Sequence, residues 1–462
     1  MPKTYAALSL LYRRTEVVAA NGAGSHGYPI KAPVQGLIKC AVVLLMMVSG
    51  CTVQAASGQQ AVLSLDDAVS IAIEGNPGLS EMRARADAMA AVPSQAGALP
   101  DPTVSLSALN VPTDTFNLDQ EPMTQLQIGI EQSLPFPGKL DLKERAAQFE
   151  ADAASSNVDE TRLRLVYNVK TIWWQLFYLD RALEIVSRNQ NLLRQFVQIA
   201  QTKYTVGEGL QQDVLLAQVE LSKLIDRELE LQGLRGQEQA RFNALLARSA
   251  DKPRVLPKTV SEEVASVLPE SQLYDLALAS RPLLIQRRQE TDAARVRRDY
   301  ARRDRYPDFK LGAAYGFRQG ENTNGSSRAD LASIRLGVSV PLYAGRKQDK
   351  AVDQRSSEFL QKQFAFEDEV VKVKADITAA FADYQRASKQ VVLFKTGIIP
   401  QARQSVASML AGYQVNKVDF LNLMRAQITL YDYETQYWKS FSDTKQALAS
   451  LAAAVGQEVT GE

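Results

Sequence analysis

The sequence predicts a mainly α-helical chain with membrane-spanning β-strands, built from two tandem copies of a helix-strand-strand-long helix-long helix unit. Three observations predict this fold. Short motifs recur in one order at a nearly constant offset, several segments alternate apolar and polar residues, and two long stretches carry apolar heptads. The 462 residues also exceed one ordinary domain core, which fits a duplicated chain.

Residues 1–50 are expected to be a signal or targeting segment. Two lysines precede the apolar run 40–48, which is too short to cross a bilayer, as in a secretory signal. The run leads into Val-Ser-Gly-Cys at 48–51, which resembles a bacterial lipobox and implies cleavage before Cys51 and acylation of its sulfur. The alternative is ordinary signal-peptidase cleavage after Ala56, with Cys51 discarded; the true start codon is left open.

Composition excludes several classes of function. The formal net charge is +1, so the chain has no bulk positive charge for binding nucleic acid. The one histidine, His26, and the two cysteines, Cys40 and Cys51, all lie in the first 51 residues. A processed chain therefore has no His/Cys zinc site, no histidine- or cysteine-based nucleophile system and no disulfide framework. We expect no cofactor, no metal site and no enzyme.

The chain repeats itself once. Five motif pairs recur at offsets between 205 and 209 residues: Asn76-Pro77 and Arg281-Pro282, Leu99-Pro100-Asp101 and Tyr306-Pro307-Asp308, Leu134-Pro135 and Val340-Pro341, Tyr204-Thr205-Val206 and Tyr413-Gln414-Val415, and Ala217-Gln218 and Ala426-Gln427. The first repeat is expected over 62–250 and the second over 270–456, joined by a Pro-punctuated polar linker at 251–269. A lipidated N-terminal linker at 51–61 and a tail at 457–462 complete the organisation.

Each copy opens with a helical stretch. In the first copy this helix is predicted over 65–91. Ser64 is its expected N-cap, with Asp67 three residues later as in a capping box.

Period-two alternation then predicts a pair of β-strands in each copy, at about 103–109, 124–134, 308–318 and 331–341. About ten residues suit a tilted membrane span. The polar side chains expected to line a pore include Gln125, Gln127, Lys310 and Arg335. The apolar side chains expected to face lipid are Phe309, Leu311, Tyr315, Phe317, Ile334, Leu336 and Val338. The alternative is a small soluble sheet whose apolar face packs on a core.

Long helices in antiparallel pairs follow the strands, predicted over about 139–203, 210–248, 345–412 and 418–456. Two series of residues recur every seven positions across 169–200, apolar except at Gln190, which is the a/d seam of a coiled coil. The second copy keeps the same step across 370–398. The first helix would be on the order of 100 Å long.

Four strands cannot close a membrane barrel, and an open sheet edge in lipid leaves backbone groups unpaired. Closure therefore requires several chains, and three chains supply twelve strands. We expect a trimeric 12-stranded β-barrel continued by an α-helical coiled-coil barrel.

The order of these features resembles the TolC-type outer-membrane efflux proteins over nearly all of 62–456. The matching residues are Leu65, Ala68, Asn76-Pro77, Pro135, Gly138-Lys139, Tyr204-Thr205-Val206-Gly207, Asp213-Val214-Leu215 and Ala217-Gln218, with their second-copy counterparts. The resemblance implies a lipid-anchored homotrimer in the bacterial outer membrane with a periplasmic helical portion. It implies a passive duct that takes substrate from a periplasmic adaptor (membrane fusion) protein and an inner-membrane pump. The joint at 135–139 and the loop at 110–116 are similar to those of the heavy-metal efflux branch.

The hairpin turns between the long helices are the adaptor-docking tips that the resemblance implies: Val206, Gly207, Glu208, Gly209 and Leu210, and Val415, Asn416, Lys417 and Val418. Gly and Asn are the residue types favoured where a reversal needs positive φ. The alternative is a helix–helix turn with no docking role.

The gate candidates at the periplasmic entrance are Asp213, Asp419, Asn422 and Arg425. Better-known family members place two aspartates after the second tip, where this chain has Asn422 and Arg425. That departure puts an acidic ring in doubt. Arg425 can instead pair with Asp213 or Asp419 across a helix interface, or each charge can simply be solvated.

A second class of function stays open at this point, a periplasmic lipid-anchored coiled-coil scaffold or adaptor without a pore. The alternating strands discriminate between the two, because a scaffold needs no apolar surface facing lipid. An enzyme is a distant third, since the sequence offers no convergent set of titratable residues.

Overall fold

The computed structural model describes residues 62–252 and 255–460. The targeting segment at 1–50 and the predicted lipidation site at Cys51 lie outside the described residues. Residues Gln60–Glu462 form one compact unit, so the two copies of the repeat are not separate domains.

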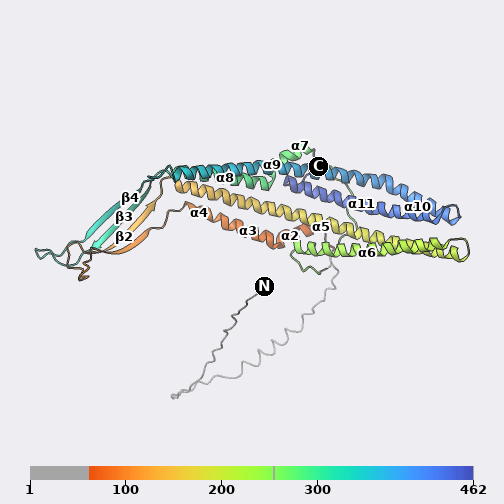
Figure 1. The fold of residues 1–462 in the computed structure, drawn as a ribbon, viewed down its shortest axis with the longest axis horizontal. Coiled ribbons are helices and arrows are strands. Elements are labelled where there is room, and N and C mark those ends of the chain that lie inside the picture. Colours follow the sequence, from red (N-terminus) through yellow and green to blue (C-terminus); the bar gives the residue numbers. More distant parts are fainter. Residues whose placement is uncertain (1–61, 253–254, 461–462) are drawn as a thin grey trace, which may run out of the picture. The chain divides into compact units, whose positions relative to one another are not determined.

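The element order follows the predicted duplication. The first copy contains α2 (Leu65–Gly75), α3 (Pro77–Ala90), α4 (Val92–Gly97), β1 (Thr103–Leu109), β2 (Gln125–Leu134), α5 (Lys139–Thr205) and α6 (Gln211–Leu245). The second contains α7 (Glu270–Ser280), α8 (Pro282–Arg303), β3 (Asp308–Phe317), β4 (Leu331–Ser339), α9 (Gln348–Leu393), the π-helical turn η1 (Phe394–Ile398), α10 (Ile399–Gln414) and α11 (Phe420–Val455). Figure 1 shows the strands at one end of the long helices and the two hairpin turns at the other.

The helix predicted over 65–91 is broken at Asn76. Ser64 caps α2 as predicted, its hydroxyl accepting the backbone N–H of Asp67 at 3.1 Å. Asn76 is extended, at φ −74° and ψ 119°, because the ring of Pro77 disfavours the helical conformation of the residue before it. The side chain of Asn76 then caps α3 by accepting the N–H of Leu79 at 3.2 Å.

The helix predicted over 345–412 is interrupted by η1. Pro400 has no N–H with which to bond the carbonyl four residues earlier. The helix accommodates this with a π turn, in which the N–H of Ile399 bonds the carbonyl of Phe394 five residues back. The second copy therefore reaches its hairpin turn through α9, η1 and α10 instead of one regular helix.

The four strands form one antiparallel sheet in the order β1-β2-β3-β4. The register places Leu311 opposite Leu336 and Leu126 opposite Phe317. Because side chains alternate along each strand, this register brings most apolar residues onto one face and most polar residues onto the other; Leu331 and Gln132 are exceptions.

The long helices pack along their heptad seams. Of the ten seam positions between 169 and 200, seven are buried and three are half-buried. Helix α5 contacts α6, α8 and α11, so it joins both copies. The largest core cluster contains Trp173, Trp174 and Phe177. The ring of Trp174 contacts Phe441 of α11, and that of Phe177 contacts Trp438. Within the described residues, we find no helix that combines the length and apolarity required to cross a bilayer.

Candidate functional site

The apolar face of the sheet has no cover in the described chain. Ile334 is 85% exposed, Leu106 82% and Leu336 68%. All seven residues predicted to face lipid lie on this face, Phe309 half-buried and the other six exposed. A soluble sheet packed on a core would bury these side chains, so this arrangement speaks against that alternative.

The opposite face is polar and partly paired. Lys310 of β3 forms an ion pair with Glu131 of β2 at 3.1 Å. Gln127 and Arg335 lie on the same face by register. Gln125 belongs to this face too, but its side chain is only 8% exposed and lies over Gly316, where a Cβ would collide with it. The prediction that Gln125 lines an aqueous surface is therefore corrected: it packs on Gly316, which has no side chain to keep it away.

The joint between β2 and α5 is fastened by Lys139. Its ammonium lies 3.1 Å from the carboxylate of Asp304 and 2.8 Å from that of Asp308, and donates to the carbonyl of Tyr306 at 3.0 Å. Asp308 also accepts the N–H of Phe136 at 2.8 Å. Burial lowers the pKa of Lys139, but the bonds to the two aspartates outweigh it, so its pKa is raised overall. Sequence reasoning missed this contact, because its acidic partners lie more than 160 residues away in the chain.

The hairpin turns have the backbone geometry predicted for them. Gly207 adopts φ 79° and Asn416 φ 58°. The N–H of Glu208 bonds the carbonyl of Lys203 at 2.8 Å, and the N–H of Lys417 bonds that of Gly412 at 2.9 Å. Most of the predicted tip residues are exposed, while Gly209 and Val418 are half-buried. Both turns therefore present accessible surface at the end of the helices that is distant from the sheet.

A lysine that the sequence reasoning did not single out joins the two hairpins. The ammonium of Lys203, in the last turn of α5, donates to the carbonyl of Tyr413 at 3.1 Å and contacts the amide oxygen of Asn416. It also lies 4.7 Å from the ring centre of Tyr413. A basic residue in the last turn of a helix is a known signal for carbonyl contacts, although here the carbonyl belongs to the neighbouring hairpin.

The gate candidates divide into two groups. Asp213, in the first turn of α6, is half-buried; burial raises its pKa, and the charge of Asp419 at the N-cap of α11 raises it further. Asn422 and Arg425 are exposed on α11. In the part of the chain that the structure describes, Arg425 forms no ion pair with Asp213 or Asp419, so the pairing considered from the sequence does not form within one chain.

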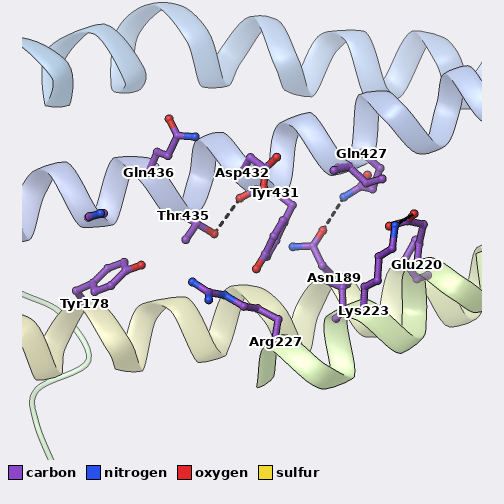
Figure 2. Close-up of a pocket in the computed structure, with 14 residues that line it drawn as sticks. Tyr178, Asn189, Glu220, Lys223, Arg227, Gln427, Tyr431, Asp432, Thr435 and Gln436 are labelled. Atoms are coloured by element: carbon purple, nitrogen blue, oxygen red, sulfur yellow. Dashed lines mark hydrogen bonds and ion pairs between the residues drawn. The ribbon is translucent and has the colours of Figure 1, made fainter. Parts of the chain in front are cut away.

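A cavity of about 450 Å³ lies between α5, α6 and α11 (Figure 2). Arg227 points toward the hydroxyls of Tyr178 and Tyr431, and burial raises the pKa of both phenols. The amide of Gln427 donates to Asn189 at 2.7 Å. These polar groups pair with one another across the helices, which is the arrangement expected of packing inside a helical wall.

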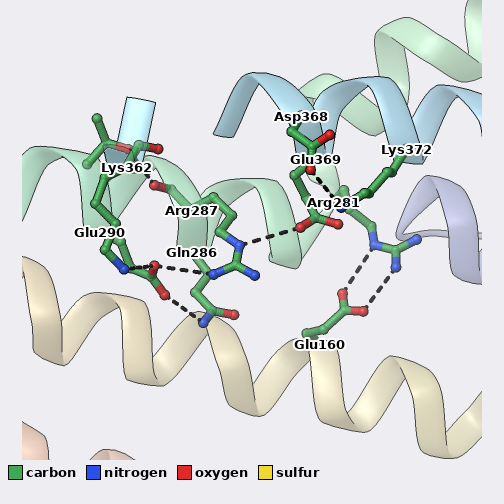
Figure 3. Close-up of polar contacts among 10 residues, drawn as sticks. Glu160, Arg281, Gln286, Arg287, Glu290, Lys362, Asp368, Glu369 and Lys372 are labelled. Atoms are coloured by element: carbon green, nitrogen blue, oxygen red, sulfur yellow. Dashed lines mark hydrogen bonds and ion pairs between the residues drawn. The ribbon is translucent and has the colours of Figure 1, made fainter. Parts of the chain in front are cut away.

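In the first third of α5, a buried ion pair at Glu160 connects the two copies (Figure 3). Arg281 donates from Nε and Nη2 to the carboxylate of Glu160 at 3.2 and 3.0 Å, and their side chains are 11% and 2% exposed. Arg281 occupies the helix break that corresponds to Asn76. Each residue donates a hydrogen bond to the end of the last helix of its own copy. The amide of Asn76 donates to the carbonyl of Leu245 at 3.0 Å, and the guanidinium of Arg281 donates to that of Ala453.

Across the residues with described positions, no group of three or more His, Cys, Asp or Glu side chains is arranged to hold a metal ion.

Comparison with known proteins yields one family. The family model described as "Outer membrane efflux protein" matches residues 68–248 and 273–457, one range for each copy. The cobalt-zinc-cadmium resistance protein CzcC of Cupriavidus metallidurans is 21% identical over 405 residues, covering 86% of this chain and 90% of that protein.

Solved structures share the fold. The outer-membrane channel OprN superimposes with a TM-score of 0.72 at 18% identity, covering 85% of this chain and 89% of OprN. CusC, whose structures describe folding and transmembrane channel formation, gives 0.71 at 16% identity, covering 85% of this chain and 92% of CusC.

Proposed function

The chain belongs to the outer membrane efflux protein family, and from this premise we propose that it is the passive, trimeric outer-membrane duct of a tripartite efflux or secretion system. The family and the proteins that it resembles are channel components, and no catalytic chemistry is required of a conduit. Its lumen, its entrance and its docking surface carry the function.

The uncovered apolar face of the sheet is the observation that carries this proposal. Lipid is the solvent in which side chains such as Ile334 and Leu336 are stable while exposed. The sheet ends at β1 and β4, whose outer edges have no partner strand among the described residues. Such edges are costly in lipid and would be satisfied by strands of sister subunits, so three chains would close a ring of twelve strands.

The remaining parts of the assembly follow from the same proposal. The exposed turns at Gly207 and Asn416 would meet a periplasmic adaptor, which an inner-membrane pump supplies with substrate. Lys203 would hold the two hairpins together at the entrance, beside the acidic pair of Asp213 and Asp419. Acylation of Cys51 would anchor the N-terminus in the membrane. Mass spectrometry should then find acyl groups on the native chain and none on the Cys51→Ser variant, whereas a native chain without acyl groups would refute the anchor.

Two relatives bear on the cargo. CzcC is named for resistance to cobalt, zinc and cadmium, and the joint at 135–139 is similar to that of the heavy-metal branch. The relative AprF of Pseudomonas aeruginosa is named for alkaline protease secretion and is 24% identical over 278 residues, covering 58% of this chain and 56% of AprF. Metal efflux is our first choice, with ions passing through the duct without a protein ligand set.

The test is export in a strain from which the gene has been deleted, challenged with metal salts, organic toxins and dyes. We expect sensitivity to cobalt, zinc or cadmium that the intact gene reverses. In parallel, purified protein should have the mass of three subunits and conduct ions in planar bilayers. A single-subunit species without conductance would refute the duct and favour the periplasmic scaffold.

A further inference from the structure

The junction between the sheet and the long helices carries a local excess of positive charge. Residues 139–145, 297–308 and 346–350 contain eleven Lys or Arg and six Asp or Glu, an excess of five positive charges. The whole chain has a formal net charge of only +1. The positive charge is therefore concentrated where β2 and β3 meet α5 and α8 (Figure 1).

A cavity of about 880 Å³ opens at this junction. Its basic lining residues are Arg145, Arg302, Arg303 and Arg305, from α5 and from the end of α8 and the turn that follows. Two acidic residues, Asp141 and Asp299, also line the cavity, and they leave the charge of its four arginines incompletely neutralised. Asp299 is shared between Arg298 and Arg302, and Arg305 pairs with Asp349 at 2.7 Å while its side chain stays 50% exposed. In the described part of the chain, Arg145 is exposed and forms no ion pair.

The position of the cavity along the strands fits a membrane surface. Tyr306 lines it and stacks on Phe136 with ring centres 4.6 Å apart. Phe136 is two residues beyond Leu134, the last residue of β2. The loop after β4 exposes Leu342 (81%) and Tyr343 (77%). Tyrosines are enriched where hydrocarbon gives way to head groups, so the arginines directly beyond them lie at the depth of lipid phosphates.

We propose that Arg145, Arg302 and Arg305 bind the phosphate groups of anionic phospholipids in the leaflet nearest the long helices. A guanidinium presents paired N–H donors that match two phosphate oxygens, and an exposed cluster of basic groups next to an apolar surface attracts anionic lipid. The inference rests on the proposed membrane function, because only an inserted sheet brings the cavity to the head groups.

The experiment compares the full chain with the triple variant Arg145→Gln, Arg302→Gln, Arg305→Gln in nanodiscs. The discs contain phosphatidylcholine alone or with one quarter phosphatidylglycerol, and native mass spectrometry counts the phosphatidylglycerol retained after detergent release. The matched control removes three positive charges elsewhere, with Lys372→Gln, Arg386→Gln and Arg241→Gln, whose side chains are 62%, 52% and 66% exposed.

The native chain and the control should retain phosphatidylglycerol, and the triple variant should bind it on the order of 100-fold more weakly, since each basic group near an anionic surface contributes about fivefold. Equal retention by native chain and triple variant would overturn the inference. So would displacement of the lipid by millimolar inorganic phosphate, which would indicate a free-phosphate site. An altered anion selectivity of conductance without altered lipid retention would place the arginines in the lumen and would also overturn it.

Insertion of the native chain into pure phosphatidylcholine distinguishes the proposed membrane function from the proposed lipid site. Failure to insert there contradicts the proposed function. Insertion without preference for the anionic lipid contradicts only the arginine site.

Discussion

Replacing Arg281 with methionine tests whether the buried ion pair fastens the two copies to each other. Arg281 makes two bonds to Glu160 and a third to the carbonyl of Ala453. The variant leaves the Glu160 carboxylate, 2% exposed, with the solvent-exposed Arg164 at 3.7 Å as its one remaining ion-pair partner among the described residues. Removing one partner of a buried pair typically costs about 3–5 kcal/mol, because the remaining charge is desolvated without compensation.

The double variant Arg281→Met with Glu160→Leu should recover much of this loss, because it leaves no buried charge behind. The two single changes should therefore couple by about 1–3 kcal/mol in a double-mutant cycle. The matched control is Arg287→Met, whose partners Glu290 and Glu369 are closer to solvent and whose own side chain is 35% exposed. That control should cost about 1 kcal/mol or less.

The assay is thermal unfolding of the purified protein in detergent, followed by circular dichroism at one detergent concentration. For roughly 400 ordered residues, a loss of about 4 kcal/mol lowers the Tm by about 5 °C. Additive effects of Glu160→Leu and Arg281→Met, or a loss for Arg287→Met as large as that for Arg281→Met, would refute the reasoning.

Three further outcomes are expected at the sheet and the tips. Leu336→Arg places a charge on the apolar face and should destabilise the membrane-inserted state by about 2–4 kcal/mol if near mid-bilayer. The control Ser333→Arg, on the polar face, should leave insertion intact. Equal yields of membrane-inserted trimer from the two variants would contradict the lipid-facing assignment. Lys203→Met removes the contact between the hairpins and should raise conductance while the Tm of the protein stays unchanged. A variant whose conductance equals that of the native chain would show that this lysine does not hold the entrance closed. Because the pKa of Asp213 is raised in the folded state, packing of the tips should be strongest at low pH and should weaken as pH rises through that pKa. Hydrogen exchange of the tip amides should show this pH dependence in the native chain and lose it in Asp213→Asn. A dependence that survives the substitution would assign it to another group.

Local patterns in the sequence determine much of this fold. Alternation predicts which residues share a face of the sheet because strand periodicity is a property of neighbouring residues, and register then extends the pattern across strands. The heptads of α5 predict its buried seam for the same reason. Gly207 and Asn416 mark the two reversals because few residue types tolerate positive φ.

Contacts between distant residues were not predictable in this way. Lys139 looks like an ordinary helix-start lysine until the fold brings Asp304 and Asp308 to it. The break at Asn76 has a local cause in Pro77, yet the long apolar periodicity around it concealed the interruption. The tip contact of Lys203 depends on how two hairpins pack, which no local pattern contains.

The duplication also explains why the two copies behave as one unit. Asn76 and Arg281 occupy equivalent helix breaks and make equivalent bonds to the ends of α6 and α11, so the backbone solution is shared. Only the second copy carries a side chain long and charged enough to reach Glu160 on α5 of the first. Arg281 makes no side-chain cap of its own, so a neutral asparagine at position 281 could supply the cap that Asn76 makes in the first copy but would lose the connection between copies. The difference between the paired positions therefore adds one polar connection between the copies to the packing of α5 against α8 and α11.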